Sequence, residues 1–474
     1  MEDKHKTTYT HRYIARIVLE AETPLTVGMG DKSIQTDAVV ATDVNGLPYI
    51  PGSSIAGVLR HAIGEDSELG NSLFGMGDKK GKNGEITEEG HGSYLIFSEA
   101  KMVGKDGKAL DGLQMIDWSD DFYTYFRHLP IRQHVRITEK GVAANTGKFD
   151  EQVVFKGARF CFEMELVSDG KNKDNFESLF NQMSSPSFRL GGGTRSGFGE
   201  IKIISIKTKD VDLTKEEDRK FYLNKSSNSS VDWEESSNSS DEYKPSTEEN
   251  GWTTYQLDLV PDDFFLFGSG LSDEDADMTP VKEPVIEWTN DRPKFEENCI
   301  LIPATSVKGA LAHRVAYYYN KLDKKFADNN EGSIGKDNVA VSTLFGSEGK
   351  KDEKDGEMKN QARGNVIFSD VIESLRLEEH VMPHVAIDRF TGGALDGALF
   401  QEKNIYGKGQ HFTAKIAVNN SAIEDDKIKK ALECSLQDIC KGLLPLGGGV
   451  NRGNGCFSGI LTKNGEVIYE PNKD

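Results

Sequence analysis

The chain has 474 residues, 28% of them charged, and a formal net charge of −20 at pH 7. So large an excess of acid excludes a protein that coats nucleic acid indiscriminately, because such binding needs a basic surface, but it still allows a local basic groove. No stretch reaches the roughly 20 apolar residues that a membrane helix needs, and the polar N-terminus lacks the apolar core of a signal peptide, so we expect a cytoplasmic protein that contacts no membrane.

The first predicted element is a strand at residues 13–20, where apolar and polar side chains alternate. A glycine-bearing loop at residues 27–30 follows it. A helix is then predicted from the sequence Pro51-Gly52-Ser53-Ser54, in which one of the two serines is the expected N-cap. Further strands are predicted at residues 93–97 and 160–167. Strands thus outnumber helices without strict alternation.

The same series of landmarks returns in the second half of the chain. The matched pairs, in chain order, are residues 13–20 with 255–260, 51–61 with 303–313, Phe74-Gly75 with Phe345-Gly346, 95–99 with 366–370, His134-Val135 with His384-Val385, and 191–193 with 447–449. In both copies a glycine- and charge-rich insertion follows the Phe-Gly pair, at residues 77–92 and 346–364. An ordered series of this kind indicates two copies of one module.

Two runs of serine and asparagine, at residues 226–230 and 236–240, lie between the copies in an acidic stretch. Such low-complexity segments bury too little apolar surface to offset the entropy of ordering. We therefore predict a first module at residues 1–210, a flexible acidic linker at residues 211–251 and a second module at residues 252–474.

The glycine run at residues 191–199 lacks the spacing of a dinucleotide-binding or P-loop motif, and it precedes a strand instead of opening a helix. Glycine there still indicates a close backbone approach, either to the module's own helix or to a phosphate. Arg195, and Arg452 beside the second glycine run, favour an anion.

His134 and His384 recur in register, with Arg136 and Arg389 nearby. A repeated histidine on a strand is either a structural residue or, beside an arginine, one that faces a phosphate backbone. The residues alone do not decide between these two roles.

Asp37 ends a loop directly before the apolar residues Ala38-Val39-Val40. A carboxylate held in this way can bind a divalent cation or activate a hydroxyl. It can equally be an ordinary loop cap, and the loop sequence by itself favours neither chemistry.

Several motifs occur together in the first copy: Val27-Gly28, Asp37-Ala38-Val39-Val40, the stretch Gly-Leu-Pro-Tyr-Ile-Pro-Gly-Ser-Ser at 46–54, Leu73-Phe74-Gly75 and Ile96-Phe97-Ser98. With the terminal glycine run they resemble the RAMP superfamily, and within it the backbone subunits of type III CRISPR effector complexes. The resemblance covers residues 10–206 and, more weakly, 252–465. Two modules in one chain resemble the fused backbone subunits of certain type III variants.

The resemblance implies an α+β fold of two tandem RRM-like (ferredoxin-like) modules, each with a protruding thumb hairpin. Subunits of this kind stack along a guide RNA, and the thumb wedges apolar side chains between bases. The thumbs are expected at residues 134–154 and 384–405. The residues expected to contact RNA are Gly52, Ser53, Ser54, Arg60, His134, Arg136, Arg195, Thr305, Ser306, Lys308, His384, Arg389 and Arg452.

The resemblance also assigns cleavage of target RNA to an aspartate before the apolar strand, which is Asp37 in this chain. Asp37 would bind Mg²⁺ or Mn²⁺ and promote attack by a ribose 2′-OH on its own 3′ phosphate. The matching position in the second copy is predicted to be Glu283, whose longer side chain would weaken that site. Four acids nearby could substitute for it: Asp273, Glu274, Asp275 and Asp277.

The partners that the resemblance implies are a guide RNA, a single-stranded target RNA and other type III effector subunits. The activity expected from it is a metal-dependent endoribonuclease within a ribonucleoprotein complex. Two other functions stay open. One is a guide-binding scaffold whose complex cuts elsewhere, and the other is a guide-processing ribonuclease that uses His5 or His11.

Overall fold

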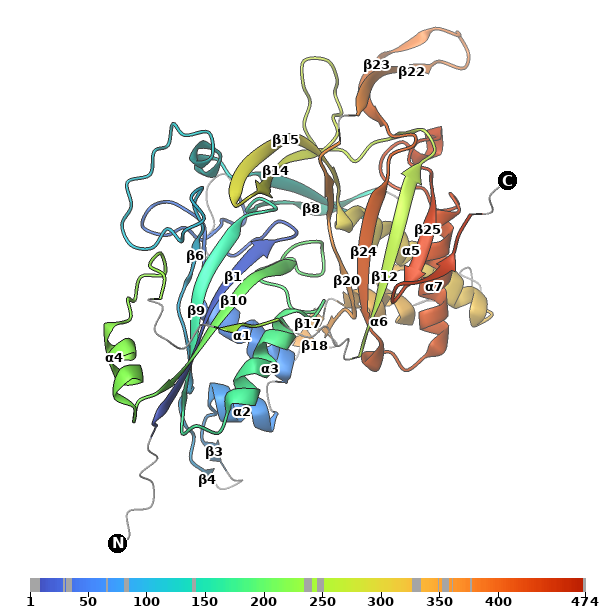
Figure 1. Cartoon of the computed structure of the whole chain (residues 1–474). Coiled ribbons are helices and arrows are strands. Elements are labelled where there is room, and N and C mark those ends of the chain that lie inside the picture. Colours follow the sequence, from blue (N-terminus) through green and yellow to red (C-terminus); the bar gives the residue numbers. More distant parts are fainter. Residues whose placement is uncertain are drawn as a thin grey trace.

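The computed structural model describes residues 9–28, 30, 36–64, 67–80, 85–138, 142–233, 241–244, 251–325, 334–347, 349–351, 358–359, 361–375 and 377–471. The chain forms two α+β halves that lie side by side, each built around its own antiparallel sheet (Figure 1). The predicted mixed fold class is thereby confirmed. No helix within these residues is long and apolar enough to cross a membrane.

The sheet of the first half contains β1 (His11–Ala21), β2 (Tyr49–Ile50), β5 (Leu95–Phe97), β6 (Ala100–Met102), β9 (Arg159–Ser168), β10 (Ile201–Asp212) and β11 (Asp241–Glu242). The strand order is β11-β10-β1-β9-β6-β2, and β5 also pairs with β9. The helices beside it are α1 (Gly52–Ile63), α2 (Glu68–Phe74) and α3 (Lys173–Met183). Leu59 of α1 and Phe180 of α3 pack with Ile17 of β1 in one buried core.

The sheet of the second half contains β12 (Trp252–Pro261), β20 (Val366–Phe368), β24 (Phe412–Asn419), β25 (Phe457–Lys463) and β26 (Glu466–Tyr469). The strand order is β20-β24-β12-β25-β26. The helices are α5 (Ala304–Leu322), α6 (Val339–Phe345) and α7 (Asp426–Cys440). Leu311 of α5 and Leu436 of α7 pack with Leu257 of β12 in a second core.

Both halves repeat one topology, a succession of strand, helix, strand, strand, helix and strand. In the first half the fourth strand, β10, lies beside the first, β1, followed by the third, β9, and the second, β5. In the second half β25, β12, β24 and β20 stand in the same order. The two series of sequence landmarks are therefore positions on one shared topology.

A hairpin leaves each sheet where a thumb is predicted. The first thumb is β7 (Ile131–Ile137) with β8 (Ala143–Gln152), and the second is β22 (Glu378–Ile387) with β23 (Ala394–Tyr406). Both have the same register, because His134 stands opposite Phe149 and His384 stands opposite Phe400. The second thumb projects beyond its module, whereas the first runs toward the second module (Figure 1). The tip residues 139–141 of the first thumb lie outside the described residues.

The predicted insertions contain short strand pairs. These are β3 (Lys79–Lys80) with β4 (Ile86–Glu88), β16 (Gly346–Ser347) with β19 (Ala362–Arg363), and β17 (Lys350–Lys351) with β18 (Met358–Lys359). A longer hairpin of the second half, β14 (Lys282–Thr289) with β15 (Arg292–Ile302), pairs with β21 (Val371–Glu373). This β14–β15 hairpin reaches the first half, where Ile286 joins the first core.

A buried ion-pair network joins the two modules. Arg132 at the base of the first thumb pairs with both Glu283 and Asp370 of the second module. The three side chains are 5%, 6% and 1% exposed. Oδ1 of Asp370 also accepts a hydrogen bond from the amide of Ala304, the first residue of α5, at 2.8 Å. The two modules therefore share a buried interface and are not connected by a flexible linker alone.

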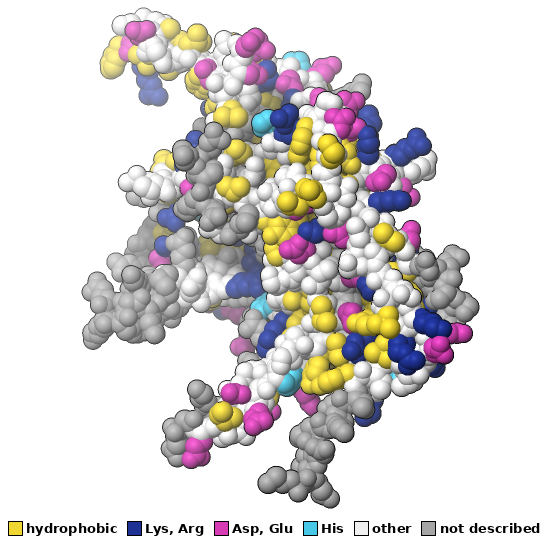
Figure 2. Space-filling model, turned by 90° about the vertical axis from the view of Figure 1, so that its left-hand side faces the viewer, with side chains coloured by type: hydrophobic (Ala, Val, Ile, Leu, Met, Phe, Trp, Pro, Cys, Tyr) yellow, Lys and Arg dark blue, Asp and Glu magenta, His cyan; other side chains and the backbone are white. Residues whose placement is uncertain are grey.

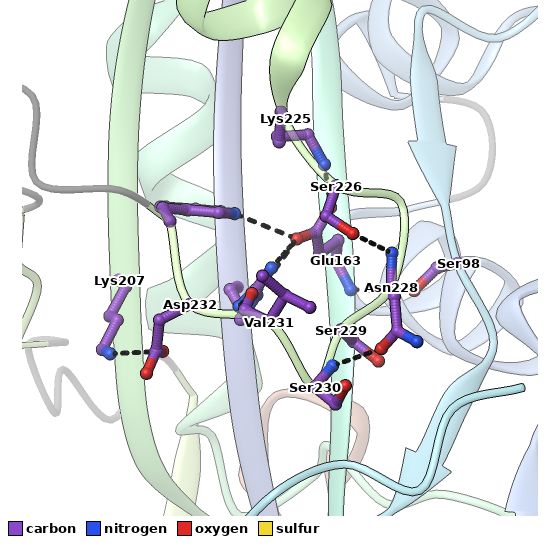
Figure 3. A network of polar contacts seen from close by, with 12 residues as sticks. Ser98, Glu163, Lys207, Lys225, Ser226, Asn228, Ser229, Ser230, Val231 and Asp232 are labelled. Atoms are coloured by element: carbon purple, nitrogen blue, oxygen red, sulfur yellow. Dashed lines mark hydrogen bonds and ion pairs between the residues drawn. The ribbon is translucent and has the colours of Figure 1, made fainter. Parts of the chain in front are cut away.

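Much of the predicted flexible linker is part of the first module, so that prediction is wrong for residues 211–233. β10 continues to Asp212, α4 (Glu216–Asn224) follows, and residues 225–233 lie across the sheet (Figure 3). Glu163 accepts hydrogen bonds there from Arg16, Lys225 and Trp233. The serine run is held because Ser229 donates hydrogen bonds to Asp111 and because the sheet face binds the residues on either side of the run. The second run, 236–240, lies outside the described residues.

Candidate nucleic-acid interface

Basic side chains from both modules meet at their junction. Arg195 comes from the glycine run of the first module, Lys308 from α5, Arg363 from β19 and His61 from the last turn of α1. Nε of Arg195 donates to the backbone carbonyl next to Arg363, at Gly364, and Nη1 of Arg363 lies 2.7 Å from Nε2 of His61. We call His61, Arg195, Lys308 and Arg363 the junction cluster. Arg195 and Lys308 were predicted separately, and the structure brings them together.

Burial and mutual repulsion act on this cluster. Burial first, and then the charge of Arg363, lowers the pKa of Arg195 to about 10. Burial and the charge of Arg195 lower the pKa of Lys308, and burial lowers that of Arg363. Among the residues that the structure describes, no carboxylate forms an ion pair with any of these three cations. A phosphate backbone would supply the missing counter-charge.

The glycine run makes the close backbone approach that the sequence predicts, and it makes it to the other module. Gly197 has a φ of +114°, and a Cβ there would stand 2.2 Å from Oδ1 of Asp370 and 2.8 Å from Cβ of Ala304. The carbonyl of Gly197 accepts a hydrogen bond from the amide of Asp370 at 3.2 Å. The run thus seats Arg195 beside the start of α5.

Each thumb carries a histidine paired with a glutamate. Nε2 of His134 lies 3.0 Å from Oε1 of Glu151, and Nε2 of His384 lies 3.1 Å from Oε2 of Glu402. Each ring also stacks on the phenylalanine opposite it in the hairpin, with ring centroids 4.8 and 5.0 Å apart. These contacts favour the structural role for both histidines, since they fix the base of the thumb. The two glutamates were missed, although they follow the stacked phenylalanines in register.

The other predicted cations have separate settings. Arg136 and Arg389 are exposed on the first and second thumb. Nη2 of Arg452 pairs with Glu402, so one carboxylate already offsets its charge. Arg60 is half-buried on α1.

Asp37 and Asp277 occupy equal positions at the bases of the two thumbs, and both are exposed. The amide of Asp37 donates to Oδ1 of Asp150 at 2.8 Å, and the amide of Asp150 donates to Oδ2 of Asp37 at 3.4 Å. In the second module the amide of Asp277 donates to the carbonyl of Gln401 at 3.0 Å, and the amide of Gln401 donates to Oδ2 of Asp277 at 2.8 Å. Asp150 and Gln401 have the same register on their thumbs.

The predicted match between Asp37 and Glu283 is therefore wrong. Glu283 is 5% exposed, and both of its carboxylate oxygens are bonded to Arg132. It offers no free oxygen to a metal ion or to RNA. The signal that identifies Asp277 is the spacing from the loop glycine, which is the same from Gly28 to Asp37 as from Gly268 to Asp277.

The family model of the RAMP superfamily matches residues 18–202 and 266–458, which include most of both sheets and both thumbs. The chain belongs to the RAMP superfamily. The two matched ranges correspond to two fused RAMP modules. A search of curated proteins finds no match. Membership implies a CRISPR-associated role in RNA binding, in a family that includes ribonucleases.

The helix start of the first RAMP module differs from the prediction of a serine N-cap, and the second module starts its helix in the same way as the first. Pro51 and Pro303 are the N-caps of α1 and α5, and neither helix has a side-chain cap. Because the extended backbone of the proline already takes the N-cap position, the four hydroxyl residues fall inside the first turn. They are Ser53, Ser54, Thr305 and Ser306, and their contact with RNA stays a prediction. Gly52 is a packing residue, since a Cβ there would stand 2.8 Å from the carbonyl oxygens of Phe97 and Ser98, at the end of β5.

A divalent cation fits the first RAMP module better than the second. Within the described ranges no three His, Cys, Asp or Glu side chains gather as a metal site. Mg²⁺ commonly takes only one or two protein carboxylates and completes its shell with water and substrate phosphates. Asp37 and Asp150 stand side by side and meet that need, whereas Asp277 stands beside Gln401, which has no charge.

The histidines of the guide-processing alternative gain no support as a catalytic site. His11 is the first residue of β1, a central strand of the first sheet, and its Nε2 lies 3.9 Å from Oδ2 of Asp212. His5 lies outside the described residues. The two modules bring the junction cluster together at their interface, and they repeat the thumb bases in matched positions.

Proposed function

We propose that this chain is a guide-RNA-binding backbone subunit of a type III CRISPR effector complex, composed of two RRM-like (ferredoxin-like) RAMP modules, and that it cuts complementary target RNA. The observation that carries the RNA-binding part is the junction cluster. An acidic protein of net charge −20 places three cations together there without a carboxylate partner among its described residues. Phosphate oxygens would relieve both the repulsion and the lost hydration.

The thumbs suit a wedge between bases. Val135 and Ile137 of the first thumb are 53% and 51% exposed, and Phe390 at the tip of the second is 99% exposed. Apolar side chains at such hairpins are disfavoured in water and favoured between unstacked bases. The paired histidine and glutamate at each base would hold the hairpin upright against the nucleic acid.

Target cleavage would occur at the base of each thumb. The 2′ oxygen of a ribose attacks the adjacent phosphorus while a proton acceptor takes the 2′-OH proton. The bond from phosphorus to the 5′ oxygen breaks, so that a 2′,3′-cyclic phosphate forms and the leaving 5′ oxygen takes a proton from water. Asp37 and Asp277 have the position to orient that hydroxyl, because a thumb amide fixes one carboxylate oxygen of each. A bound divalent cation would supply charge neutralisation at the phosphate. The prediction of a weak second module rested on Glu283, and this proposal instead assigns the second cut to Asp277, with Gln401 in place of Asp150 as the remaining difference between the modules.

The affinity for guide RNA tests whether the junction cluster binds RNA. Affinity for a single-stranded guide RNA is measured against salt for wild type and Lys308→Met, with Lys220→Met on α4 as a control for loss of charge. Each lost phosphate contact should lower the slope of log affinity against log salt by about 0.7. We expect that loss for Lys308→Met only. Equal slopes for both variants would refute binding at the junction.

A non-catalytic scaffold is the second candidate. The observation that favours it is the lack of three gathered metal-ligating side chains within the described residues. The two candidates separate in the cutting pattern of Asp37→Asn and Asp277→Asn complexes. A scaffold predicts no change in either variant.

A further inference from the structure

The two modules are in contact through the β14–β15 hairpin of the second module. This hairpin corresponds to a short turn in the first module. A hydrogen bond of the same kind marks the equivalent place in both modules. The amide of Ala41 donates at 2.7 Å to a backbone carbonyl of the glycine-bearing loop before it, and so does the amide of Val281. The amide of Tyr49 in turn donates to the carbonyl of Ala41 at 3.2 Å, and the amide of Leu301 donates to the carbonyl of Val281 at 3.3 Å. The β14–β15 hairpin of the second module therefore stands where the first module has the short turn at 43–46.

The β14–β15 hairpin docks into a group of aromatic rings of the first module. The ring of Phe295 lies 5.6 Å from Phe122, 3.9 Å from Tyr125, 5.9 Å from Phe126 and 5.0 Å from Phe155, measured between centroids. We call these four rings the aromatic socket. Beside the socket, Arg132 of the first module reaches Asp370 of the second. One module thus offers a socket and a cation, and the next offers an apolar tip and an acid.

The first module carries its own apolar tip at the equivalent place. Val44, Leu113 and Met115 are 75%, 81% and 103% exposed, and we call them the apolar knob. Asn45 ties the turn to the loop, since its Nδ2 donates to the carbonyl of residue 112 at 2.9 Å and its Oδ1 accepts from the amide of Gln114 at 2.8 Å. The loop leading to these residues lies at the left edge of the first module, away from the second (Figure 1). Figure 2, which faces that side, shows hydrophobic side chains at the surface among charged ones.

The first module also carries an exposed acid at the sequence position that Asp370 has in the second module. Glu99 takes the sequence place of Asp370, after the same Ile-Phe-Ser. Its side chain is 52% exposed, with Lys101 as its ion-pair partner. The outward face of the first module therefore repeats, without a covering module, the two features that the second module buries against the first.

A second copy of this chain does not match this face. Residues 103–130 supply three of the four socket rings, and in the second module only residues 374–377 separate β21 from β22. The register of the thumbs puts Met382 where the first module has Arg132. The second module thus lacks both the segment that forms the socket and the cation that meets the acid.

We propose that the apolar knob docks a different protein subunit of the effector complex, one that offers an apolar or aromatic socket beside a basic side chain. This proposal rests on the proposed function for the presence of the chain in such a complex. It goes beyond that function by assigning the surface, the chemistry of the partner and the exclusion of self-stacking.

Site-specific photo-crosslinking tests the proposal in the assembled complex with the full chain. A benzophenone amino acid replaces Leu113, and the control carries it at Leu223, which is 75% exposed on α4. We expect a protein cross-link from position 113 to another subunit, absent from position 223 and lost when Val44→Ser and Met115→Ser are added. A cross-link to a second copy, to RNA or to nothing would overturn the proposal.

The failure of the proposed function has a different signature. If the purified chain assembles no guide-RNA-containing complex, the proposed function and this proposal both fail. If the complex forms and cuts target RNA but position 113 gives no cross-link, only the docking proposal fails. Sedimentation of the isolated chain adds a check, since self-stacking would appear as a mass that rises with protein concentration, and that result contradicts the proposal.

Discussion

Replacement of Arg132 by methionine, the residue at the equivalent place in the second thumb, should strongly destabilise the module junction. Arg132 is the shared partner of Glu283 and Asp370, and all three side chains are almost fully buried. Burial lowers its pKa, but Asp370 and Glu283 raise it further, so the net shift is upward. Removing one partner of a buried ion pair costs about 3–5 kcal/mol, because the other charge stays buried and unpaired. Because Arg132→Met leaves two buried carboxylates without a partner, the expected loss in free energy of unfolding is at the upper end of this range, about 5 kcal/mol.

Denaturant unfolding followed by tryptophan fluorescence measures this loss. The matched control is Arg389→Met, an exposed arginine of the other thumb, for which the change should stay within about 0.5 kcal/mol. Adding Glu283→Gln and Asp370→Asn to Arg132→Met should restore much of the stability, because the stranded charges are gone. A loss below about 1 kcal/mol for Arg132→Met alone would refute the assigned role of the buried network.

Three further outcomes are expected. Gly197→Ala should lower the free energy of unfolding, measured thermally, by at least about 2 kcal/mol, because its φ is +114° and its Cβ would meet Asp370. Gly57→Ala, in a helix with open space around it, should raise the free energy of unfolding by about 0.5–1 kcal/mol. Burial raises the pKa of Glu200, but Arg189 and a hydrogen bond from Ser369 lower it overall. Its contribution to stability is therefore present above pH of about 4.3 and is lost as pH falls through the lower folded pKa, so Glu200→Gln should flatten the stability curve in acid. Trp233→Ala removes a ring 5.1 Å from the Arg16 guanidinium and a bond to Glu163, and amide exchange at residues 225–233 should rise about tenfold.

The repeat was readable from the sequence because its landmarks are local and keep their order. Helix starts, strand alternation and the register of His134 with His384 depend on neighbouring residues, and the structure places each of them on one shared topology. Glu283 was matched to Asp37 because it directly precedes the apolar residues at 284–286, as Asp37 precedes those at 38–40. That apolar run belongs to the β14–β15 hairpin, which the first copy lacks, whereas counting forward from Gly268 reaches Asp277.

The linker and the junction cluster depended on contacts that composition does not show. The run at 226–230 is polar enough to predict disorder, but Glu163 and Arg16 on the sheet face bind the residues that flank it. Arg363 comes from an insertion far along the chain from Arg195 and His61. No local pattern connects these residues, so the cluster exists only once the two modules have packed together.

The cutting pattern of a guide-complementary RNA by the assembled complex, with Mg²⁺ or Mn²⁺, tests the proposed function most directly. It is compared for wild type, Asp37→Asn, Asp277→Asn and the double variant, with Asp426→Asn on α7 as an exposed control. Two cuts are predicted in wild type, one lost in each single variant and both lost in the double variant, with guide RNA still bound. An unchanged pattern in the double variant would contradict cleavage by this chain and leave it a guide-binding scaffold.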